Sequence, residues 1–464
     1  MNYIPTIGLE IHVQLKTKSK MFCSCDNNAE SKAPNTVVCP VCMGLPGVLP
    51  VPNKQALEWA VKLGKFLEGE VSQTTKFDRK NYFYPDLPKG YQISQYDEPI
   101  VKGGKIRIDD REIHLERIHI EEDAGKLIHI KDKNYSLVDF NRAGTPLLEI
   151  VTKPEINSPE EAKKFMQRLR LIVRYLGISD GDMEKGHLRC DANISITETH
   201  DSKLMTQSLG TPVEIKNLNS FLMVERALKY EIDRQSKLID VEEKVIKETR
   251  GWDDDRGKTI SQRSKEQAED YRYFPEPDIP SFINIDKEFK IELPETIDEK
   301  IIKYKNSGVS QQDIDTILND DQLLLIADEI IGSDIDTKVK IRSLNLAINI
   351  VAIRDLSVNF ITDLVRAIEE GKVGQPAIQP IIKLGLEKHI SVDEAIKEGS
   401  FEQVSDTGEL REIIIKIISQ NPGAVADYKK GKENAITFLT GQVMRETRGR
   451  ANPQEIYKLL REAL

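Results

Sequence analysis

The sequence predicts an α+β fold, in which a mixed β-sheet domain is followed by a region made of helices alone. Three observations support this prediction: alternating apolar runs before residue 290, two helix patterns among those runs, and a change of composition after Pro294. Runs that alternate apolar and polar residues, as half-buried strands do, occur at 7–13, 106–108, 118–121, 193–196 and 213–216.

Two helices are marked within the first part of the chain. The first is predicted from Ser158, with a proline in its first turn, to a stop at Gly177. The second is predicted over 221–238, where apolar residues recur at helical spacing. After Pro294 aromatic residues become rare and apolar residues recur at helical spacing, so residues 295–464 are predicted to be helical throughout.

We expect three domains, at 1–294, 295–407 and 408–464. Residues 281–330 contain twelve acidic and five basic residues, a net charge of −7, whereas residues 421–464 contain eight basic and five acidic residues, a net charge of +3. A basic end on an acidic chain hints at contact with a polyanion, and a solvated helical surface explains the same count.

The composition is that of a soluble globular protein, with 39% hydrophobic and 31% charged residues among 464. No apolar run approaches the ~18 residues that a membrane span needs, and the first 14 residues lack a secretory signal pattern, so we expect a cytoplasmic protein. The formal charge of −10 argues against a surface coated with DNA-binding charge, although a local nucleic-acid site remains compatible with it.

Four of the five cysteines lie close together in the sequence. They form the pattern Cys23-x-Cys25 and, thirteen residues later, Cys39-x2-Cys42. Two such pairs on a short hairpin can supply four thiolates to a tetrahedral zinc ion, and such a site would be structural because it has no open position. Reduced thiols without a metal, or a redox-active pair, are the alternative to a zinc site. Cys190, outside the cluster, is expected to be a small core residue.

Glu10 and His12 lie two residues apart in an alternating run, so both project from the face opposite Ile11. A carboxylate and an imidazole side by side suit a divalent cation or acid–base chemistry, although polar residues on the wet face of a strand are the more common explanation. The neighbouring acids at 121–123 form a second cluster. Three adjacent carboxylates repel one another unless a cation or a basic partner neutralises them.

Other predicted strands also carry polar residues on one face. Arg189 and Asp191 share a face of one strand, and Glu214 and Lys216 share a face of the next. Several strands with one polar face indicate a cleft rather than a closed sandwich. The segment 76–85 mixes cations with aromatic rings, which suits phosphate contact and ring stacking, while a structured loop explains it equally well.

Two common motifs are missing from the sequence. Residues 251–259 resemble a Walker loop, but five residues separate the glycines where four are needed, and three aspartates would repel phosphates. Neither the Gly/Ser-rich nucleophile loop of amidases nor a Gly-x-Ser-x-Gly elbow is found. If the protein uses ATP, we therefore expect its magnesium to be held by residues on several strands.

Eight blocks of sequence together resemble the GatB family, the B subunits of the glutamine-dependent aspartyl/glutamyl-tRNA amidotransferase. The resemblance is strong over 3–290, departs from the family pattern at 371–386, and extends weakly to 438–453. The eight blocks are IGLEIH at 7–12, FDRKNYFYPD at 77–86, YQISQ at 91–95, EEDAGK at 121–126, DFNRAGTPLLE at 139–149, LRCDANIS at 188–195, EIKNLNSF at 214–221 and DYRYFPEPDI at 270–279.

This resemblance implies a ligase that acts on misacylated tRNA, carrying Asp on tRNA(Asn) or Glu on tRNA(Gln). With ATP and Mg²⁺ the family phosphorylates the side-chain carboxyl, and ammonia then displaces the phosphate to form the amide. A separate amidase subunit releases that ammonia from glutamine, and the two are bridged by a small third subunit. The resemblance also implies a β-sheet cradle similar to the catalytic fold of glutamine synthetase and guanido kinases.

By the same resemblance, Glu10, His12 and Glu122 match the magnesium ligands of the family, and together with Lys80 they are the expected catalytic residues. Strand alternation alone favours Glu121, because Glu121 shares a face with His119. We therefore rank Glu122 first on the motif and keep Glu121 beside it as a magnesium ligand.

Cationic residues complete the expected site. Lys80 is the candidate for contact with the transferring phosphate, and Arg189 and Lys216 are weaker candidates for the ATP phosphates. The cysteine quartet matches the zinc-bearing branch of the family. The expected tRNA-binding residues are basic and lie in the last domain: Lys429, Lys430 and Lys432 in one loop, and Arg445, Arg448 and Arg450 at the end of a helix.

Two alternatives compete with this prediction. The related archaeal subunit makes only Gln-tRNA and is longer because of an inserted domain, for which this chain has no room. A zinc-containing protein that binds tRNA without catalysing a reaction is the other alternative, and the intact Glu10, His12 and Glu122 set argues against it. The sequence leaves open which misacylated tRNA is the natural substrate, since that depends on the synthetases of the organism.

Overall fold

The computed structural model describes residues 3–130, 133–198, 210–264, 271–402, 407–447 and 451–464. Residue contacts divide the chain into two compact units, 1–296 and 297–464. The first unit contains a mixed sheet and the second is built from helices, which confirms the predicted α+β class. The further division at residue 407 stays a prediction.

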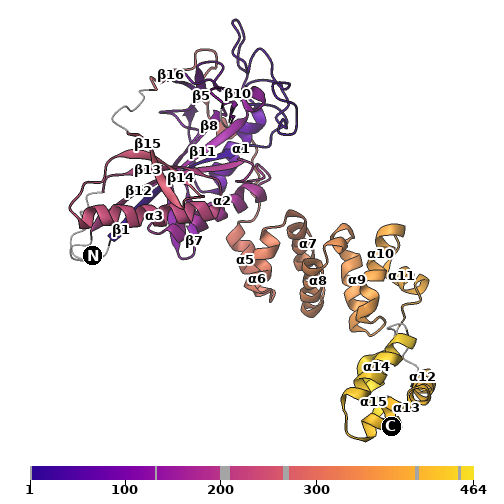
Figure 1. The fold of residues 1–464 in the computed structure, drawn as a ribbon. Coiled ribbons are helices and arrows are strands. Elements are labelled where there is room, and N and C mark those ends of the chain that lie inside the picture. The colour runs from indigo at the N-terminus through magenta and orange to yellow at the C-terminus, as the bar shows by residue number, and fades with distance from the viewer. Residues whose placement is uncertain (1–2, 131–132, 199–209, 265–270, 403–406, 448–450) are drawn as a thin grey trace. The chain divides into compact units, whose positions relative to one another are not determined.

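A large β-sheet forms the centre of the first unit (Figure 1). Its middle strand β1 (Tyr3–Gln14) pairs antiparallel with β11 (Pro146–Thr152) on one side and β12 (Leu188–Glu198) on the other. Beyond β12 the order continues with β13 (Val213–Leu218), β14 (Glu248–Asp253) and β15 (Lys258–Ser264). Beyond β11 it continues with β8 (Arg111–Glu122), β6 (Val101–Lys102) and β2 (Glu70–Val71), while β7 (Lys105–Ile108) pairs with β8. The parallel pairing of β13 with β14 makes the sheet mixed.

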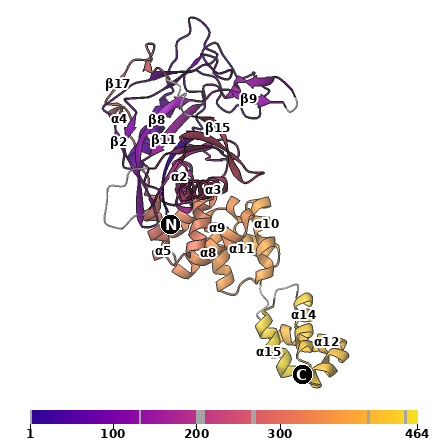
Figure 2. The ribbon, with the colours of Figure 1, turned by 60° about the vertical axis from the view of Figure 1, so that its left-hand side comes forward.

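Alternation along β1 separates an apolar face from a polar face. Ile7, Leu9 and Ile11 are at most 1% exposed, whereas Glu10 and His12 lie on the opposite face. Helix α3 (Phe221–Asp240) packs against β12 and β13, and α2 (Pro159–Tyr175) packs against α3, so both helices cover the apolar side of the sheet (Figure 2). Burial of each large aliphatic side chain contributes roughly 1.5–3 kcal/mol, which fixes the orientation of the sheet relative to its helices.

Helices α2 and α3 confirm the two predicted helices. The hydroxyls of Ser158 and Ser220 each accept a hydrogen bond, of 3.1 Å, from the backbone N–H three residues later, and so cap the two helices. The predicted strands are also confirmed, since each of the five alternating runs lies within an observed strand.

Small sheets and short helices surround the large sheet. One three-stranded sheet has the order β16 (Phe274–Pro275), β4 (Asp78–Asn81), β5 (Tyr91–Ser94). The Gln92 side chain donates to the Glu122 carbonyl (2.7 Å), which holds this small sheet on the end of β8. The remaining elements of the unit are β3 (Thr74–Thr75), β17 (Phe282–Ile283), β9 (Lys126–His129), β10 (Ser136–Asp139), the 3-10 helix η1 (Phe140–Arg142), α1 (Lys54–Phe66) and α4 (Ile285–Glu288).

Helices make up the second unit in the described ranges. The first group is α5 (Ile297–Asn306), α6 (Gln311–Leu318), α7 (Asp321–Gly332), α8 (Thr337–Asn349), α9 (Val358–Glu369), α10 (Ile378–Lys388) and α11 (Val392–Glu398), with the 3-10 turns η3 (Val351–Asp355) and η4 (Gln375–Ala377). The last four are α12 (Thr407–Gln420), α13 (Pro422–Lys429), α14 (Asn434–Glu446) and α15 (Pro453–Ala463). Leu410, Ile436 and Leu460 belong to a core that these four helices share. Among the described helices, none has both the length and the apolarity of a transmembrane span.

Candidate active site

The polar face of the large sheet brings charged side chains together in register. Arg189 of β12, His12 of β1, Glu149 of β11 and His119 of β8 are direct neighbours across four adjacent strands. Residues directly opposite one another on paired strands share a face, with Cβ atoms about 4.5–5.5 Å apart. Strand pairing alone therefore places one imidazole on each side of the Glu149 carboxylate.

Two carboxylates lie between these imidazoles. The His12 Nε2 atom is 3.2 Å from Glu121 Oε1 and 3.5 Å from Glu149 Oε2. The His119 Nε2 atom is 3.3 Å from Glu149 Oε2 and 3.8 Å from Glu121 Oε2. The Ser94 hydroxyl of β5 donates to Glu121 as well (3.3 Å). Both carboxylates are almost fully buried, so these contacts replace most of their hydration.

The cluster contains two donor sets that can each hold a metal ion. One set is Glu10, His12 and Glu149, and the other is His119, Glu121 and Glu149. Within each set the donor atoms lie within 4.8 Å of one another. Carboxylate oxygens are the donors that Mg²⁺ and Mn²⁺ prefer, and imidazole nitrogens suit softer divalent ions, so the chemistry of the donors fits a divalent cation.

The electrostatics of the face favour cations. Burial opposes the charged form of His12, but hydrogen bonds to Glu121 and Glu149 outweigh burial and raise its pKa to about 10. Burial likewise opposes the charged form of His119, and the Glu149 charge leads the contributions that raise its pKa to about 9. Burial raises the pKa of Glu10, and repulsion from Glu149 raises it further. The two carboxylates therefore stabilise the protonated form of both imidazoles, whereas burial and the Glu149 charge disfavour a charge on Glu10.

Glu122 lies apart from this cluster. Its Oε1 atom accepts from the Ile93 backbone N–H (3.0 Å) and pairs closely with the Lys89 ammonium. Successive residues of β8 point to opposite faces, so Glu121 reaches His12 and Glu122 does not. Glu121, and not Glu122, therefore faces the imidazoles, as strand alternation predicted, and we take Glu121 as the first candidate ligand in this geometry. A metal-binding role for either acid stays a prediction.

Lys80 lies close to the carboxylates. It belongs to β4, and its ammonium is 4.9 Å from the ring centre of Tyr271. Burial opposes its charge, but the carboxylates of Glu121 and Glu149 outweigh burial and raise the pKa of Lys80 above its usual range. Lys80 therefore stays cationic beside the acidic cluster, which is the position that contact with a phosphate requires.

Arg189 and Lys216 lie on the same face but are already paired. Arg189 Nη2 is 2.8 Å from an Asp123 oxygen, and Lys216 Nζ is 2.6 Å from Asp191 and 3.1 Å from Glu214. Among the described residues, the buried Nε of Arg189 has no hydrogen-bond partner, so that guanidinium keeps one donor available.

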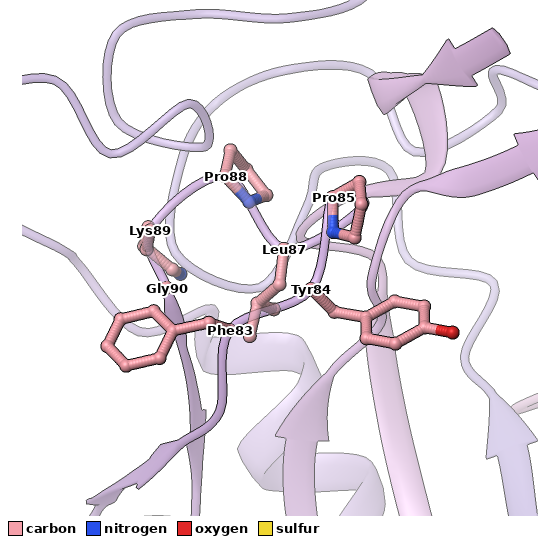
Figure 3. A pocket seen from close by; sticks show the side chains of 7 residues that line it. All are labelled: Phe83, Tyr84, Pro85, Leu87, Pro88, Lys89 and Gly90. Atoms are coloured by element: carbon pink, nitrogen blue, oxygen red, sulfur yellow. The ribbon is translucent and has the colours of Figure 1, made fainter. Parts of the chain in front are cut away.

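The segment between β4 and β5 forms an ordered loop with exposed rings. An open pocket of about 500 Å³ lies against it, lined by Phe83, Tyr84, Pro85, Leu87, Pro88, Lys89 and Gly90 (Figure 3). Phe83 is 83% exposed and Tyr84 59% exposed, whereas Leu87 is buried. The Gly125 N–H donates to the Asp86 carbonyl (2.7 Å) and attaches the loop to the segment that follows β8.

The four clustered cysteines converge in the structure. Their sulfur atoms lie within 4.8 Å of one another, so Cys23, Cys25, Cys39 and Cys42 can hold one metal ion. The hydrogen bond from Cys23 lowers the pKa of the Cys42 thiol to about 5. The segment 23–42 forms turns and bends rather than the predicted hairpin, since backbone pairing near it is limited to one bridge, Ser19 with Asp26.

The remaining cysteine and the predicted tRNA-binding residues are placed as follows. Cys190 is 3% exposed and packs in the core, as predicted.

Lys430, Lys432 and Arg445 are exposed, and Lys432 pairs with Asp427 at 3.0 Å. Exposed Lys429 is the last residue of α13 rather than part of a loop, whereas Arg448 and Arg450 lie outside the described residues.

Sequence reasoning did not single out Glu149, which belongs to both donor sets. The first five side chains of β11 are buried without alternation, because β11 is an inner strand covered on both sides. The block DFNRAGTPLLE, which ends at Glu149, was the only signal in the sequence that could have found it.

The fold and the site define a protein with a mixed sheet, one face of which carries carboxylates that could hold a cation, and a second unit made of helices. The model of the GatB/GatE catalytic domain matches residues 5–290, and the model of the GatB domain matches residues 336–464. The chain therefore belongs to the GatB family.

Curated relatives match along essentially their whole length. The aspartyl/glutamyl-tRNA(Asn/Gln) amidotransferase B subunit of Thermotoga maritima is 45% identical over 485 aligned positions, which cover 100% of this chain and 99% of that protein. The proteins of the same name from Thermosipho melanesiensis and Carboxydothermus hydrogenoformans are 43% and 42% identical. Both alignments cover 100% of this chain and at least 99% of the relative.

The buried pair of Lys89 and Glu122 predicts a strong energetic coupling. Their side chains are 8% and 4% exposed, so removing one partner leaves an uncompensated buried charge. We expect Lys89→Met to lower the free energy of unfolding by about 3–5 kcal/mol. The double variant with Glu122→Gln should lose clearly less than the sum of the two single variants.

Tryptophan fluorescence during urea unfolding measures this effect, because both tryptophans, Trp59 and Trp252, belong to the first unit. Lys105→Met is the control: Lys105 pairs with Glu68 and Glu112 at a more exposed site and should change the free energy of unfolding by less than about 1 kcal/mol. Additive losses in the double variant would show that the pair is not coupled.

Proposed function

We propose that this chain is the subunit of a tRNA-dependent amidotransferase that activates and amidates the amino acid on misacylated tRNA. The substrate is Asp-tRNA(Asn), Glu-tRNA(Gln) or both. ATP phosphorylates the side-chain carboxyl of the attached amino acid, and ammonia then displaces the phosphate to give the amide. The observation that carries the proposal is the cluster of buried Glu121 and Glu149 with half-buried Glu10 and His12 on the polar sheet face.

The residues of this face suit carboxyl activation. Catalysis of phosphoryl transfer consists mainly of positioning and of neutralising charge on the transferring group. Glu149 together with Glu10 or with Glu121 would hold Mg²⁺, which supplies that neutralisation when bound. His12 donates to two of these carboxylates and orients them. Lys80 adds a fixed positive charge beside them, where it can bind a phosphoryl oxygen.

The proposed partner subunits are inferred from a motif that the sequence lacks and from the names of the curated relatives. The sequence contains no amidase nucleophile motif, so glutamine would be hydrolysed by a separate amidase subunit, with a small third subunit joining the two. We also propose that the complex is cytoplasmic. The relatives are named as subunits of an amidotransferase and align over at least 99% of their length, which leaves no room for the archaeal insertion.

A protein that only binds tRNA explains the site less well. Burying several carboxylates side by side is unfavourable without a cation, and a surface for nucleic-acid binding needs no such cluster. The catalytic interpretation accounts for the buried acids and for Lys80 together.

We also propose that the four clustered cysteines bind a structural zinc ion. Four cysteine sulfurs that lie within 4.8 Å of one another match the ligand set of closed, four-coordinate zinc centres. Lys20 donates to the Val37 carbonyl (2.8 Å) and lies 3.9 Å from the Cys42 sulfur, where its charge favours thiolates.

Substitution of Glu121 tests the metal cluster. Glu121→Gln removes a ligand charge from the second donor set and should reduce amide formation by roughly a thousandfold or more, because several kcal/mol of charge stabilisation is lost. The assay measures amidation of charged tRNA by the purified complex, while glutamine hydrolysis by the partner should stay measurable.

The control for that substitution is the neighbouring acid. Glu122→Gln should retain Mn²⁺ affinity, measured by calorimetry on folded protein, whereas Glu121→Gln should lose it. Near-normal amidation by the Glu121 variant would remove this cluster from the active site.

Elemental analysis tests the zinc proposal. The purified chain should contain one zinc per molecule, and Cys42→Ser should lower the zinc content and the unfolding midpoint more than the activity per folded molecule. Cys190→Ala should keep its zinc, since Cys190 lies outside the cluster. A stable chain with no zinc and a disulfide among these cysteines would contradict the proposal.

The exposed cations of the last helices are our candidates for tRNA contact. Replacing Lys429, Lys430 and Arg445 by alanine should weaken binding of charged tRNA and reduce the slope of log affinity against log salt by roughly 2–3, because each phosphate contact releases counterions. Lys383→Ala, at an exposed position of α10, is the matched control. An unchanged salt slope in the triple variant would show that these cations do not hold the tRNA.

A further inference from the structure

Lys20 is a fully buried lysine beside the cysteine cluster. Its side chain is 1% exposed, and it is among the largest of the fully buried side chains in the described part of the chain. A lysine is almost never buried to this degree without a partner of opposite charge, because transferring an ammonium out of water is strongly unfavourable. The burial of Lys20 therefore requires an anion nearby.

No acidic side chain supplies that anion. Among the residues that the structure describes, Lys20 forms no ion pair with an aspartate or glutamate. The segment between the first and the last clustered cysteine contains two acids. One of them, Asp26, pairs with Lys32. The other, Glu30, lies 3.5 Å from His187, so both acids are engaged elsewhere.

The Lys20 ammonium contacts one carbonyl and one sulfur. It donates to the Val37 carbonyl (2.8 Å) and to the Cys42 sulfur (3.9 Å). The carbonyl is an acceptor without a net charge, so it compensates the ammonium only in part. The Cys42 sulfur can carry a full negative charge as a thiolate, which makes it the anion that the buried lysine requires.

The backbone holds Lys20 at this position from three sides. The Lys20 N–H donates to the Cys25 carbonyl (2.9 Å), and the Lys20 carbonyl accepts from the Asn53 side chain (3.2 Å). The following N–H, of Met21, donates to the Gly144 carbonyl (2.7 Å). Lys20 is thereby attached to the cysteine segment, to the residue that caps α1 and to the turn before β11.

The side chains of Lys20 and Cys42 also pack against the same turn. A Cβ atom added at Gly144 would lie 3.5 Å from Lys20 Cδ and 3.5 Å from Cys42 Cβ. It would lie 3.8 Å from a Glu122 oxygen, but that carboxylate already pairs closely with Lys89. The packed stem of Lys20 keeps its ammonium beside the sulfur rather than beside Glu122.

A cluster of four thiolates needs such a cation when it holds a metal. Four thiolates around a divalent zinc ion leave two negative charges uncompensated. The Cys39 N–H donates to the Cys42 sulfur (3.1 Å) and disperses part of this charge. A full positive charge near the same sulfur reduces the repulsion further, and groups behind the ligands commonly tune metal affinity in this way.

We infer that Lys20 is the counter-cation of the cysteine cluster: its ammonium stabilises the Cys42 thiolate and thereby increases the affinity for zinc. Lys20 is a positioning residue, since it acts through Cys42 and does not itself bind the metal. The inference rests on the proposed zinc site and adds to it the residue that balances the charge of that site.

The experiment uses the purified full chain and compares wild type with Lys20→Met, which keeps an unbranched side chain and removes the charge. Zinc affinity is measured by competition with a chelator of known affinity. Lys20→Met should weaken zinc binding by roughly tenfold to a hundredfold, the usual effect of losing a group that supports a metal ligand. Lys32→Met is the matched control and should leave zinc affinity unchanged, because Lys32 lies in the same segment but pairs with Asp26 at an exposed position.

A second variant separates the charge of Lys20 from its hydrogen bonding. Lys20→Gln has no charge but can still donate a hydrogen bond to the Val37 carbonyl, so it should lose zinc affinity as Lys20→Met does. It carries the same test if Lys20→Met does not fold. Wild-type affinity in Lys20→Gln would show that the hydrogen bond rather than the charge supports the site, and the inference would then be wrong.

Cobalt(II) in place of zinc gives a readout that a purely structural lysine would not change. The sulfur-to-cobalt charge-transfer band moves an electron away from sulfur, and a neighbouring positive charge raises the energy of that transition. The band should therefore shift to longer wavelength in Lys20→Met and Lys20→Gln, while the d–d bands keep the pattern of tetrahedral coordination. A band at the wild-type wavelength in both variants would contradict a charge effect on Cys42.

The inference and the proposed zinc site fail in different ways. If wild type binds zinc and both charge-removing variants bind it with the same affinity, Lys20 is not the counter-cation. If the wild-type chain binds no zinc, the proposed zinc site itself is refuted.

Discussion

Carboxylates that are buried close together repel one another, and the first unit is arranged around this constraint. Glu121 and Glu149 sit on a nearly dry sheet face, where a charge has little water to stabilise it. His12 and His119 compensate by hydrogen bonding to both carboxylates, and Lys80 adds a positive charge from a separate strand. The carboxylate oxygens that these cationic groups hold together are the donors that a divalent cation prefers.

Strand β1 contributes to the core through its apolar face and to the candidate site through its polar face. The apolar side chains of β1 pack beneath the sheet towards α2 and α3, while Glu10 and His12 lie above it. Because β1 pairs along most of its length with β12 and is also flanked by β11, its side chains have little freedom to move. A cluster built on inner strands is held more accurately than one built on loops, which suits phosphoryl transfer, where positioning accounts for much of the catalysis.

Adjacent residues of β8 connect two different parts of the unit. Glu121 points to the imidazole cluster, and Glu122 points to Lys89, which lies over the ring of Phe22 near the cysteine cluster. The small sheet that carries Lys80 is attached to the same end of β8 through β5. The cysteine cluster, the small sheet and the candidate metal site therefore all lie near the same end of β8.

The sequence by itself determined the features that depend on local pattern. Alternation placed Glu10 and His12 on one face, capping signals marked α2 and α3, and paired cysteines indicated a metal site. Alternation also favoured Glu121 over Glu122, whereas the motif ranked Glu122 first, and the structure places Glu121 beside His12 because successive residues of a strand point to opposite faces. Tertiary structure decided the rest. Glu149 lies in a strand that is buried without alternation, and Tyr96 stacks on Tyr273 from a distant segment, so both depend on strand pairing over long sequence separations, which local periodicity does not encode.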